Sequence, residues 1–299
     1  KKAIMPKAAT SLVSANQQRL YKDVEFLTEL RPYRNWVELE SLEKCCSYIT
    51  TEFSKVSYEI TAQKWKVHGN EYTNVIASYA PQKKKRLIVG AHYDVAGEQP
   101  GADDNASSVA GLLETARLLS ASGLDLDYGV DFVAYCLEEP PFFGTPHMGS
   151  YIHANSLYKS KTEVLGMINY EMIGYFSEEL NSQTCVYFPE LKNILPSIGD
   201  FIFLVGQQGH AKFTKSIYKG MKQDAEVDIR MHNFPDGGGF AGFSDHRNYW
   251  KFGFPAVMIT DTGFERNFNY HRISDTIDTL NFEKMKAVVN STFLAITGL

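Results

Sequence analysis

The chain has 299 residues, of which 44% are hydrophobic and 22% are charged, a composition typical of a globular protein. Its formal net charge of −5 argues against a nucleic-acid partner, because proteins that bind nucleic acid usually present a basic face. No run of about 18 apolar residues occurs, so we expect no membrane insertion. The first six residues, Lys-Lys-Ala-Ile-Met-Pro, lack the apolar core of a secretion signal.

Helices and strands are expected to alternate along most of the chain. Residues 14–54 show the spacing of amphipathic helices, with a break near Pro32. Short apolar runs typical of buried strands follow, and a helix is expected to begin near Asn105. Further apolar runs precede a last helix, which we expect from Phe282 onward. The predicted strands are 73–79, 86–92, 131–137, 164–170, 201–205 and 256–260.

This order of elements predicts an α/β fold in which a largely parallel sheet lies between helices. No internal repeat, low-complexity tract or linker divides the sequence, so we expect one domain over residues 1–299 with the N-terminal helical segment packed on it. The four cysteines lack the paired spacing of a metal site. Buried free thiols are expected, and a disulfide between two of them is the alternative in an oxidising compartment.

Acidic and histidine side chains recur where the predicted strands end. In parallel-sheet proteins such positions converge beyond the carboxyl edge of the sheet, where ligands bind. Buried carboxylates persist when they are paired or hold a metal ion, and a mixture of imidazole and carboxylate suits zinc in a catalytic site. The residues concerned are His92 and Asp94, then Asp103 and Asp104, then Glu138 and Glu139, then Glu171, and finally His271 and Asp275.

These motifs, in this order, resemble the zinc exopeptidase family that contains the bacterial leucyl aminopeptidases, aminopeptidase Y and glutamate carboxypeptidase. The glutaminyl cyclases share the fold of that family. The resemblance extends from about Leu20 to the C-terminus. It implies a mixed, mostly parallel central sheet that is flanked by helices on both faces.

The resemblance also implies a role for each motif residue. His92 and Glu171 would bind one zinc ion, Asp104 would bridge both ions, and Glu139 and His271 would complete the second site. Asp94 would orient the ring of His92, and Glu138 would be the general base. The family likeness further implies a cis peptide bond between Asp104 and Asn105. Asp275 would either support His271 or cap a helix.

Two features depart from the common family pattern. Glu171 stands where the peptidases usually carry aspartate, and its side chain is one methylene longer. The loop 140–150 contains three prolines and two phenylalanines in place of a shorter glycine-rich turn, and these rings would line a pocket or pack on the core.

A glycine-rich stretch, 237–246, ends in Ser-Asp-His and lies near the substrate site in the family. Consecutive residues cannot form the side-chain relay of a serine protease, so we reject that interpretation. We expect Phe240, Tyr270 and His246 to contact the substrate.

The sequence therefore predicts a metalloenzyme that hydrolyses the first peptide bond of substrates with a free N-terminus, with water activated by two zinc ions and Glu138 as base. A glutaminyl cyclase with a single zinc ion is the main alternative. Carboxypeptidase or dipeptidase action is a weaker option, because no basic clamp for a terminal carboxylate is evident. A catalytically silent binding domain is disfavoured, because every ligand position keeps a side chain able to bind metal.

Overall fold

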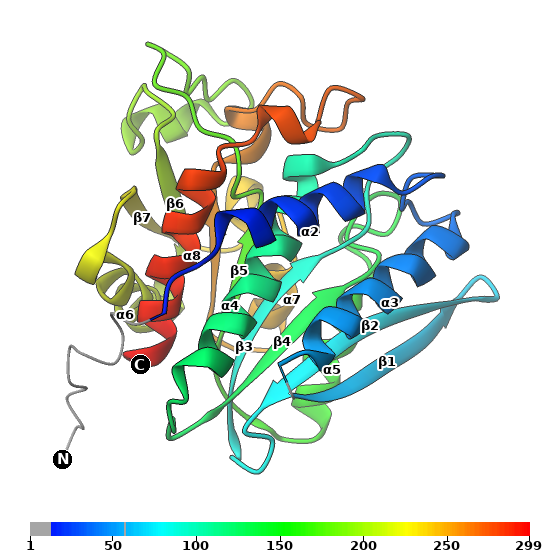
Figure 1. Ribbon diagram of the computed structural model, residues 1–299. Helices are drawn as coiled ribbons and strands as arrows, with labels where there is room; N and C mark the ends of the chain where they lie inside the picture. Colours follow the sequence, from blue (N-terminus) through cyan, green and yellow to red (C-terminus); the bar gives the residue numbers. More distant parts are fainter. Residues whose placement is uncertain (1–12, 57) are drawn as a thin grey trace.

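The computed structural model describes residues 13–56 and 58–299, and its centre is a twisted sheet of eight strands (Figure 1). The strand order is β1-β2-β4-β3-β5-β8-β6-β7. The four middle strands β4, β3, β5 and β8 are mutually parallel, whereas β2 and β6 run antiparallel to the neighbours that flank this group. The bounds are β1 (Glu59–Val67), β2 (Asn70–Tyr79), β3 (Lys85–His92), β4 (Gly129–Tyr135), β5 (Glu163–Glu171), β6 (Phe201–Gln207), β7 (Asp228–Phe234) and β8 (Ala256–Thr260).

Helices cover both faces of the sheet. Helices α3, α4, α6 and α8 pack against one face, with α2 lying outside α4 and α8, and α5 and α7 cover the other face (Figure 1). The bounds are α2 (Gln17–Glu29), α3 (Leu39–Ser54), α4 (Ser108–Ser122), α5 (Gly149–Lys159), α6 (Ala211–Met221), α7 (His246–Lys251) and α8 (Phe282–Thr297).

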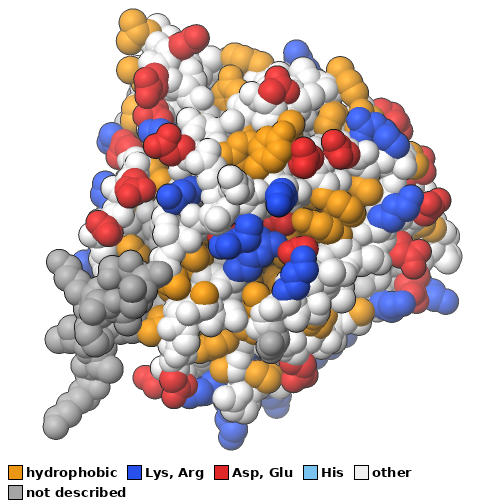
Figure 2. All heavy atoms as spheres, in the orientation of Figure 1, with side chains coloured by type: hydrophobic (Ala, Val, Ile, Leu, Met, Phe, Trp, Pro, Cys, Tyr) orange, Lys and Arg blue, Asp and Glu red, His pale blue; other side chains and the backbone are white. Residues whose placement is uncertain are grey.

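The central strand β4 and helix α4 are almost entirely covered by neighbouring elements. All seven residues of β4 are buried, as expected for a parallel strand that is covered on both faces. Helix α4 is buried around most of its circumference because α2 covers its outer side. One charged residue on α4, Glu114, is fully buried and pairs with Arg19 of α2 at 2.5 Å. Figure 2 shows the side of the molecule that faces the viewer in Figure 1. Basic side chains gather near the middle of this side, beside acidic ones.

The predicted fold class is confirmed, and each predicted strand corresponds to an observed one. Strands β1 and β7 and helices α5, α6 and α7 were not predicted. Strand β1 is an edge strand whose residues are mostly exposed or half-buried, so no apolar run marks it. All four cysteines are free thiols. The opening residues considered for a secretion signal lie outside the described residues.

In the described part of the chain, no helix combines the length and apolarity needed to cross a bilayer.

Candidate metal centre

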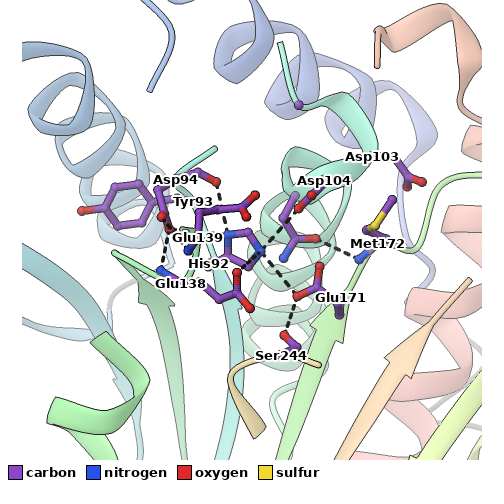
Figure 3. Close-up of polar contacts among 12 residues, drawn as sticks. His92, Tyr93, Asp94, Asp103, Asp104, Glu138, Glu139, Glu171, Met172 and Ser244 are labelled. Atoms are coloured by element: carbon purple, nitrogen blue, oxygen red, sulfur yellow. Dashed lines mark hydrogen bonds and ion pairs between the residues drawn. The ribbon is translucent and has the colours of Figure 1, made fainter. Parts of the chain in front are cut away.

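The predicted site lies at the carboxyl edge of the parallel strands. His92 is the last residue of β3, Glu171 is the last residue of β5, and Glu138 and Glu139 follow β4. Because these strands are adjacent and parallel, their ends converge at one edge of the sheet (Figure 3). The loop between β3 and α4 brings Asp104 to the same place.

Asp104 lies between two histidines. Its Oδ1 is 3.5 Å from Nε2 of His92, and its Oδ2 is 3.1 Å from Nε2 of His271. Glu171 Oε2 lies 3.4 Å from the same nitrogen of His92, and Glu139 Oε2 lies 3.1 Å from that of His271. The structure therefore forms two neighbouring clusters, each with one histidine and one further carboxylate, which share Asp104.

These separations fit metal ligands. Two ligand atoms that each lie 2.0–2.1 Å from a tetrahedral zinc ion are about 3.3–3.4 Å apart. The observed separations of 3.1–3.5 Å bracket that value. His92 and the acids around it form two candidate metal-binding groups, one with Glu138 and Glu171 and one with Asp104 and Glu139. The donor set of imidazole and carboxylate is the one zinc favours in catalytic sites.

The electrostatics of the cluster also call for a cation. Burial raises the pKa of Glu138 well above its ordinary value, and burial together with the Asp104 charge raises the pKa of Glu139 to about 8. Burial lowers the pKa of His271, but the adjacent Asp104 and Glu139 outweigh this effect and raise it to about 10. Carboxylates this crowded and this buried cannot all ionise unless positive charge is added.

Asp94 connects the end of β3 to the acidic pair. Its two carboxylate oxygens accept the backbone amides of Glu138 and Glu139, each at 3.2 Å (Figure 3). Its Oδ1 lies 3.5 Å from Nδ1 of His92, on the side of the ring opposite the cluster. Asp94 therefore contacts the His92 ring from behind and also fixes the backbone of the residues after β4.

Glu171 is held by two polar residues that the sequence did not assign. The hydroxyl of Ser244 donates a hydrogen bond to Oε2 of Glu171. The Asn169 amide donates to the Ser244 oxygen at 2.7 Å, so the hydroxyl hydrogen is left for Glu171. Asn169 and Glu171 are two residues apart on β5, and their side chains therefore lie on the same face of the strand.

The loop that carries Asp104 is fixed by Asp275. The Asp275 carboxylate accepts the backbone amides of Asp103 at 2.9 Å and Asp104 at 3.1 Å. Of the two roles considered for Asp275, support of His271 is therefore not seen, and the contact with amides resembles a cap. The peptide bond between Asp104 and Asn105 is cis, as the family likeness implied.

Several non-glycine residues at the site have left-handed backbone conformations. The φ angles are 63° at Leu137, 51° at Met172, 84° at Thr262 and 56° at His271. Such conformations are uncommon for residues with a side chain, and they concentrate at functional sites where the surrounding structure enforces them. Their gathering at this edge of the sheet supports a functional role for it.

An apolar pocket opens beside the carboxylates. Its walls contain Phe143, Met172, Phe240, Phe243, Met258 and Phe264, and Tyr270 adjoins His271. The Phe143 ring lies 5.5 Å from that of Phe243, so the phenylalanine of the unusual proline-rich loop lines the pocket. The other ring of that loop, Phe142, is buried in the core against Trp36.

The three predicted substrate contacts have different positions. Phe240 and Tyr270 line the pocket, and their contact with the substrate stays a prediction. His246 does not, because its ring is fully buried and its Nε2 lies 2.6 Å from the Ala241 carbonyl. This prediction is corrected: His246 fastens the turn that carries Phe240 and does not face the pocket.

Sequence reasoning missed Asn169 and Arg34, and it singled out the stretch with Ser244 and Asp245 without giving either residue a role. Asp245 is fully buried, neither of its carboxylate oxygens has a hydrogen-bond partner among the residues that the structure describes, and burial raises its pKa to about 7. The Ser-Asp-His part of the chain was noted as functional, which is the signal that points to Ser244 and Asp245. No signal in the sequence marks Arg34.

Two curated proteins are similar to this chain in sequence. The uncharacterized protein YfbL of Escherichia coli is 39% identical over 284 residues, which cover 92% of this chain and 86% of that protein. Leucine aminopeptidase 1 of Aspergillus clavatus is 26% identical over 85% of this chain, and the match spans 63% of that enzyme's length.

Solved structures share the fold. The LapA aminopeptidase of Legionella pneumophila has a TM-score of 0.76 at 17% identity, with 98% of this chain and 74% of that chain covered. The glutaminyl cyclase of Fimbriiglobus ruber has a TM-score of 0.69 at 21% identity, with 95% and 96% covered. At these identities the likeness shows the fold alone.

A family match identifies the protein more directly. Residues 74–296, about three quarters of the chain, match Peptidase family M28. This match confirms the prediction of a zinc-dependent hydrolase that acts on peptides. The protein belongs to Peptidase family M28.

Proposed function

We propose that the protein is an aminopeptidase with two zinc ions, which removes the first residue from peptides with a free N-terminus. The observation that carries the proposal is the placement of Asp104, whose two oxygens face two different histidines at 3.5 and 3.1 Å. His92 and Glu171 would hold one ion, Glu139 and His271 would hold the other, and Asp104 would contact both. Zinc ions bound there would supply Lewis-acid activation of water and of the scissile carbonyl.

Glu138 is the proposed general base. It lies next to the ligand Glu139 on the chain, and its Oε2 is 3.7 Å from Nε2 of His92, the longest of that nitrogen's carboxylate contacts. Burial raises the pKa of Glu138, which suits a group that accepts a proton from the attacking water and then returns it to the departing amine.

The apolar pocket is proposed to hold the side chain of the first substrate residue. It adjoins Glu138, Glu139 and Glu171, so a side chain inside it would place the substrate's amino group close to carboxylates. An N-acetylated peptide has no basic amine to gain from this negative charge. The arrangement thus favours peptides with a free amino terminus and a large apolar first residue.

Glutaminyl cyclases share the fold, so the fold does not separate the two activities. The pocket supplies an argument for the peptidase. Its two threonines are engaged within the protein: the Thr260 hydroxyl accepts the backbone amide of Thr262, and the Thr262 hydroxyl bonds the Gln183 side chain. The Thr262 hydroxyl both accepts from and donates to Gln183, and the rings and methionines of the pocket suit an apolar side chain better than the amide of a glutamine substrate.

The proposal is tested with a panel of aminoacyl-p-nitroanilides and an N-terminal glutaminyl peptide, before and after chelation and after zinc is added back. We expect release of p-nitroaniline that chelation stops and zinc restores, and no action on N-acetylated substrates. Formation of pyroglutamate without hydrolysis would replace the aminopeptidase proposal with the cyclase. The zinc content of the purified protein is measured in parallel, with two ions per chain expected.

A further inference from the structure

Arg34 is a fully buried arginine in the connection between α2 and α3. It precedes the residues that match the peptidase family, which begin at residue 74. Its guanidinium donates hydrogen bonds to four backbone carbonyls: Tyr93 at 2.8 Å, Leu27 at 3.1 Å, Gly101 at 2.7 Å, and Pro100. An arginine with this many carbonyl contacts joins segments that are far apart in the sequence.

Two of the joined segments carry the metal-binding side chains. Tyr93 lies between His92 and Asp94, and Pro100 and Gly101 begin the loop that leads to Asp104. The backbone carbonyl of Arg34 also accepts the amide of Val95 at 3.2 Å, which adds a second contact to the end of β3. Arg34 thereby links the backbone next to His92 to the backbone of the Asp104 loop.

The Asp104 loop is held from both ends. Arg34 contacts the carbonyls at its start, and Asp275 accepts the amides of Asp103 and Asp104 further along. Gly101 accepts a hydrogen bond from Arg34 and lies two residues before Asp103, whose amide donates to Asp275. Its φ is +60°. A Cβ at Gly101 would overlap the Asp104 carbonyl and the Val95 side chain and would lie 3.0 Å from Nη2 of Arg34, so the close approach requires glycine.

The charge of Arg34 has an unusual setting. Within residues 13–56 and 58–299, no carboxylate forms an ion pair with this guanidinium, although a buried charge is normally paired. Burial lowers the pKa of Arg34, and the charges that counteract this effect are those of Cys45 and then of three acids at the site, Asp275, Asp104 and Asp94. The guanidinium therefore lies within electrostatic range of acids that surround the proposed metal ligands.

We propose that Arg34 is a positioning residue of the metal centre, which fixes the distance between His92 and Asp104 and offsets part of the negative charge around them. The inference rests on the proposed function, because it concerns the same metal-binding side chains. It also assigns to the N-terminal helical segment a part in building the site.

The test compares Arg34→Met with Arg266→Met. Arg266 is the matched control, because it is also buried and its Nη1 donates to two carbonyls, those of Tyr175 at 3.2 Å and Phe201 at 3.0 Å. Neither of those residues is a proposed ligand. Zinc affinity is measured by competition with a chelator, and the melting temperature of each metal-free variant is measured separately.

We expect Arg34→Met to weaken zinc binding by about 10- to 100-fold, the usual effect of removing a group that supports metal ligands, and to lower kcat with little change in KM. Arg266→Met should lower the melting temperature and leave zinc affinity within about twofold of wild type. Equal losses of zinc affinity in the two variants, or unchanged affinity in Arg34→Met, would overturn the assignment.

A second pair covers the case in which Arg34→Met does not fold. Arg34→Lys keeps the charge but lacks the planar fork that reaches several carbonyls, so it should still bind zinc more weakly than Arg266→Lys. Equal zinc affinity of the two lysine variants would reject the inference. A wild-type protein that binds no zinc would instead reject the proposed function itself, and the two failures are thereby distinguished.

Discussion

Ser244 donates a hydrogen bond to Oε2 of Glu171, the carboxylate oxygen that faces His92 Nε2 at 3.4 Å. Glutamate is one methylene longer than the aspartate expected at this position from the family likeness, and it therefore has more rotamers to lose when it binds a metal ion. The Ser244 hydroxyl selects one of them. The hydrogen bond from Asn169 to Ser244 fixes the direction of that hydroxyl in turn.

Removing this hydroxyl should weaken the zinc site at His92. We expect Ser244→Ala to lower zinc affinity at one of the two sites by about 10- to 100-fold and to leave the other site unchanged. Zinc titration of the metal-free protein, followed by calorimetry, measures both sites. Ser291→Ala is the control, because the Ser291 hydroxyl is buried in α8 and has no hydrogen-bond partner within residues 13–56 and 58–299. Equal affinity in the two variants would show that Ser244 does not orient Glu171.

The rim of the pocket offers a test of substrate preference. Phe243 is 39% exposed, and its ring lies 5.5 Å from Phe143 and 5.2 Å from Phe264. Phe243→Ala should lower kcat/KM for leucyl and phenylalanyl substrates by about 10-fold, equivalent to about 1.4 kcal/mol of lost apolar contact, and should affect alanyl substrates much less. Tyr158→Ala removes an exposed aromatic ring outside the pocket and serves as the control. A uniform loss over all substrates would argue against a pocket role for Phe243.

Three of the proposed ligands, His92, Glu139 and Glu171, could be placed from the sequence because strand ends are readable from it, whereas the roles of Asp104 and His271 were implied by the family likeness. An apolar run that stops at His92, or at Glu138 and Glu139, marks both a buried strand and the residues at its carboxyl end. Parallel neighbours then bring these ends together without further information. The order of the strands and the antiparallel direction of β6 were not predictable, since both depend on tertiary pairing.

The groups that support the ligands were less accessible to sequence reasoning. For Asp275 the sequence left two roles open, support of His271 and a helix cap, and its carboxylate accepts the amides of the Asp104 loop. His246 was assigned to the substrate because of its neighbours, yet its ring bonds the Ala241 carbonyl inside the protein. In both cases tertiary packing sets the partner of the side chain, so this partner cannot be inferred from spacing along the chain.

A buried histidine away from the metal centre should make stability depend on pH. Burial lowers the pKa of His153 to about 4, and its Nδ1 lies 2.6 Å from the Tyr249 hydroxyl. Because the folded pKa lies below the ordinary value of 6.5, the neutral ring favours the folded state. Its contribution is present above pH 6.5 and is lost as the pH falls from 6.5 toward 4.

The size of this effect follows from the shift. A change from 6.5 to about 4 corresponds to on the order of 3 kcal/mol of unfolding free energy. His153→Gln cannot titrate, so its stability should fall less than that of wild type between pH 6.5 and pH 4. Urea unfolding of both metal-free proteins at several pH values measures the difference. Parallel curves for the two proteins would show that His153 is not the titrating group.

Glu138 and Glu139 are adjacent in the chain, yet the proposed mechanism gives them different functions, which substitution can separate. Glu138→Gln removes the proton acceptor, and we expect kcat to fall by about 10²- to 10⁴-fold while two zinc ions remain bound. Glu139→Gln removes a ligand whose Oε2 lies 3.1 Å from His271 Nε2, so the zinc content itself should fall. Metal analysis and steady-state kinetics on both variants give the comparison. If Glu138→Gln lost zinc, Glu138 would be a ligand, in agreement with its place beside His92 and Glu171 in one of the candidate metal-binding groups. The base would then have to be sought among the remaining buried acids, such as Asp245.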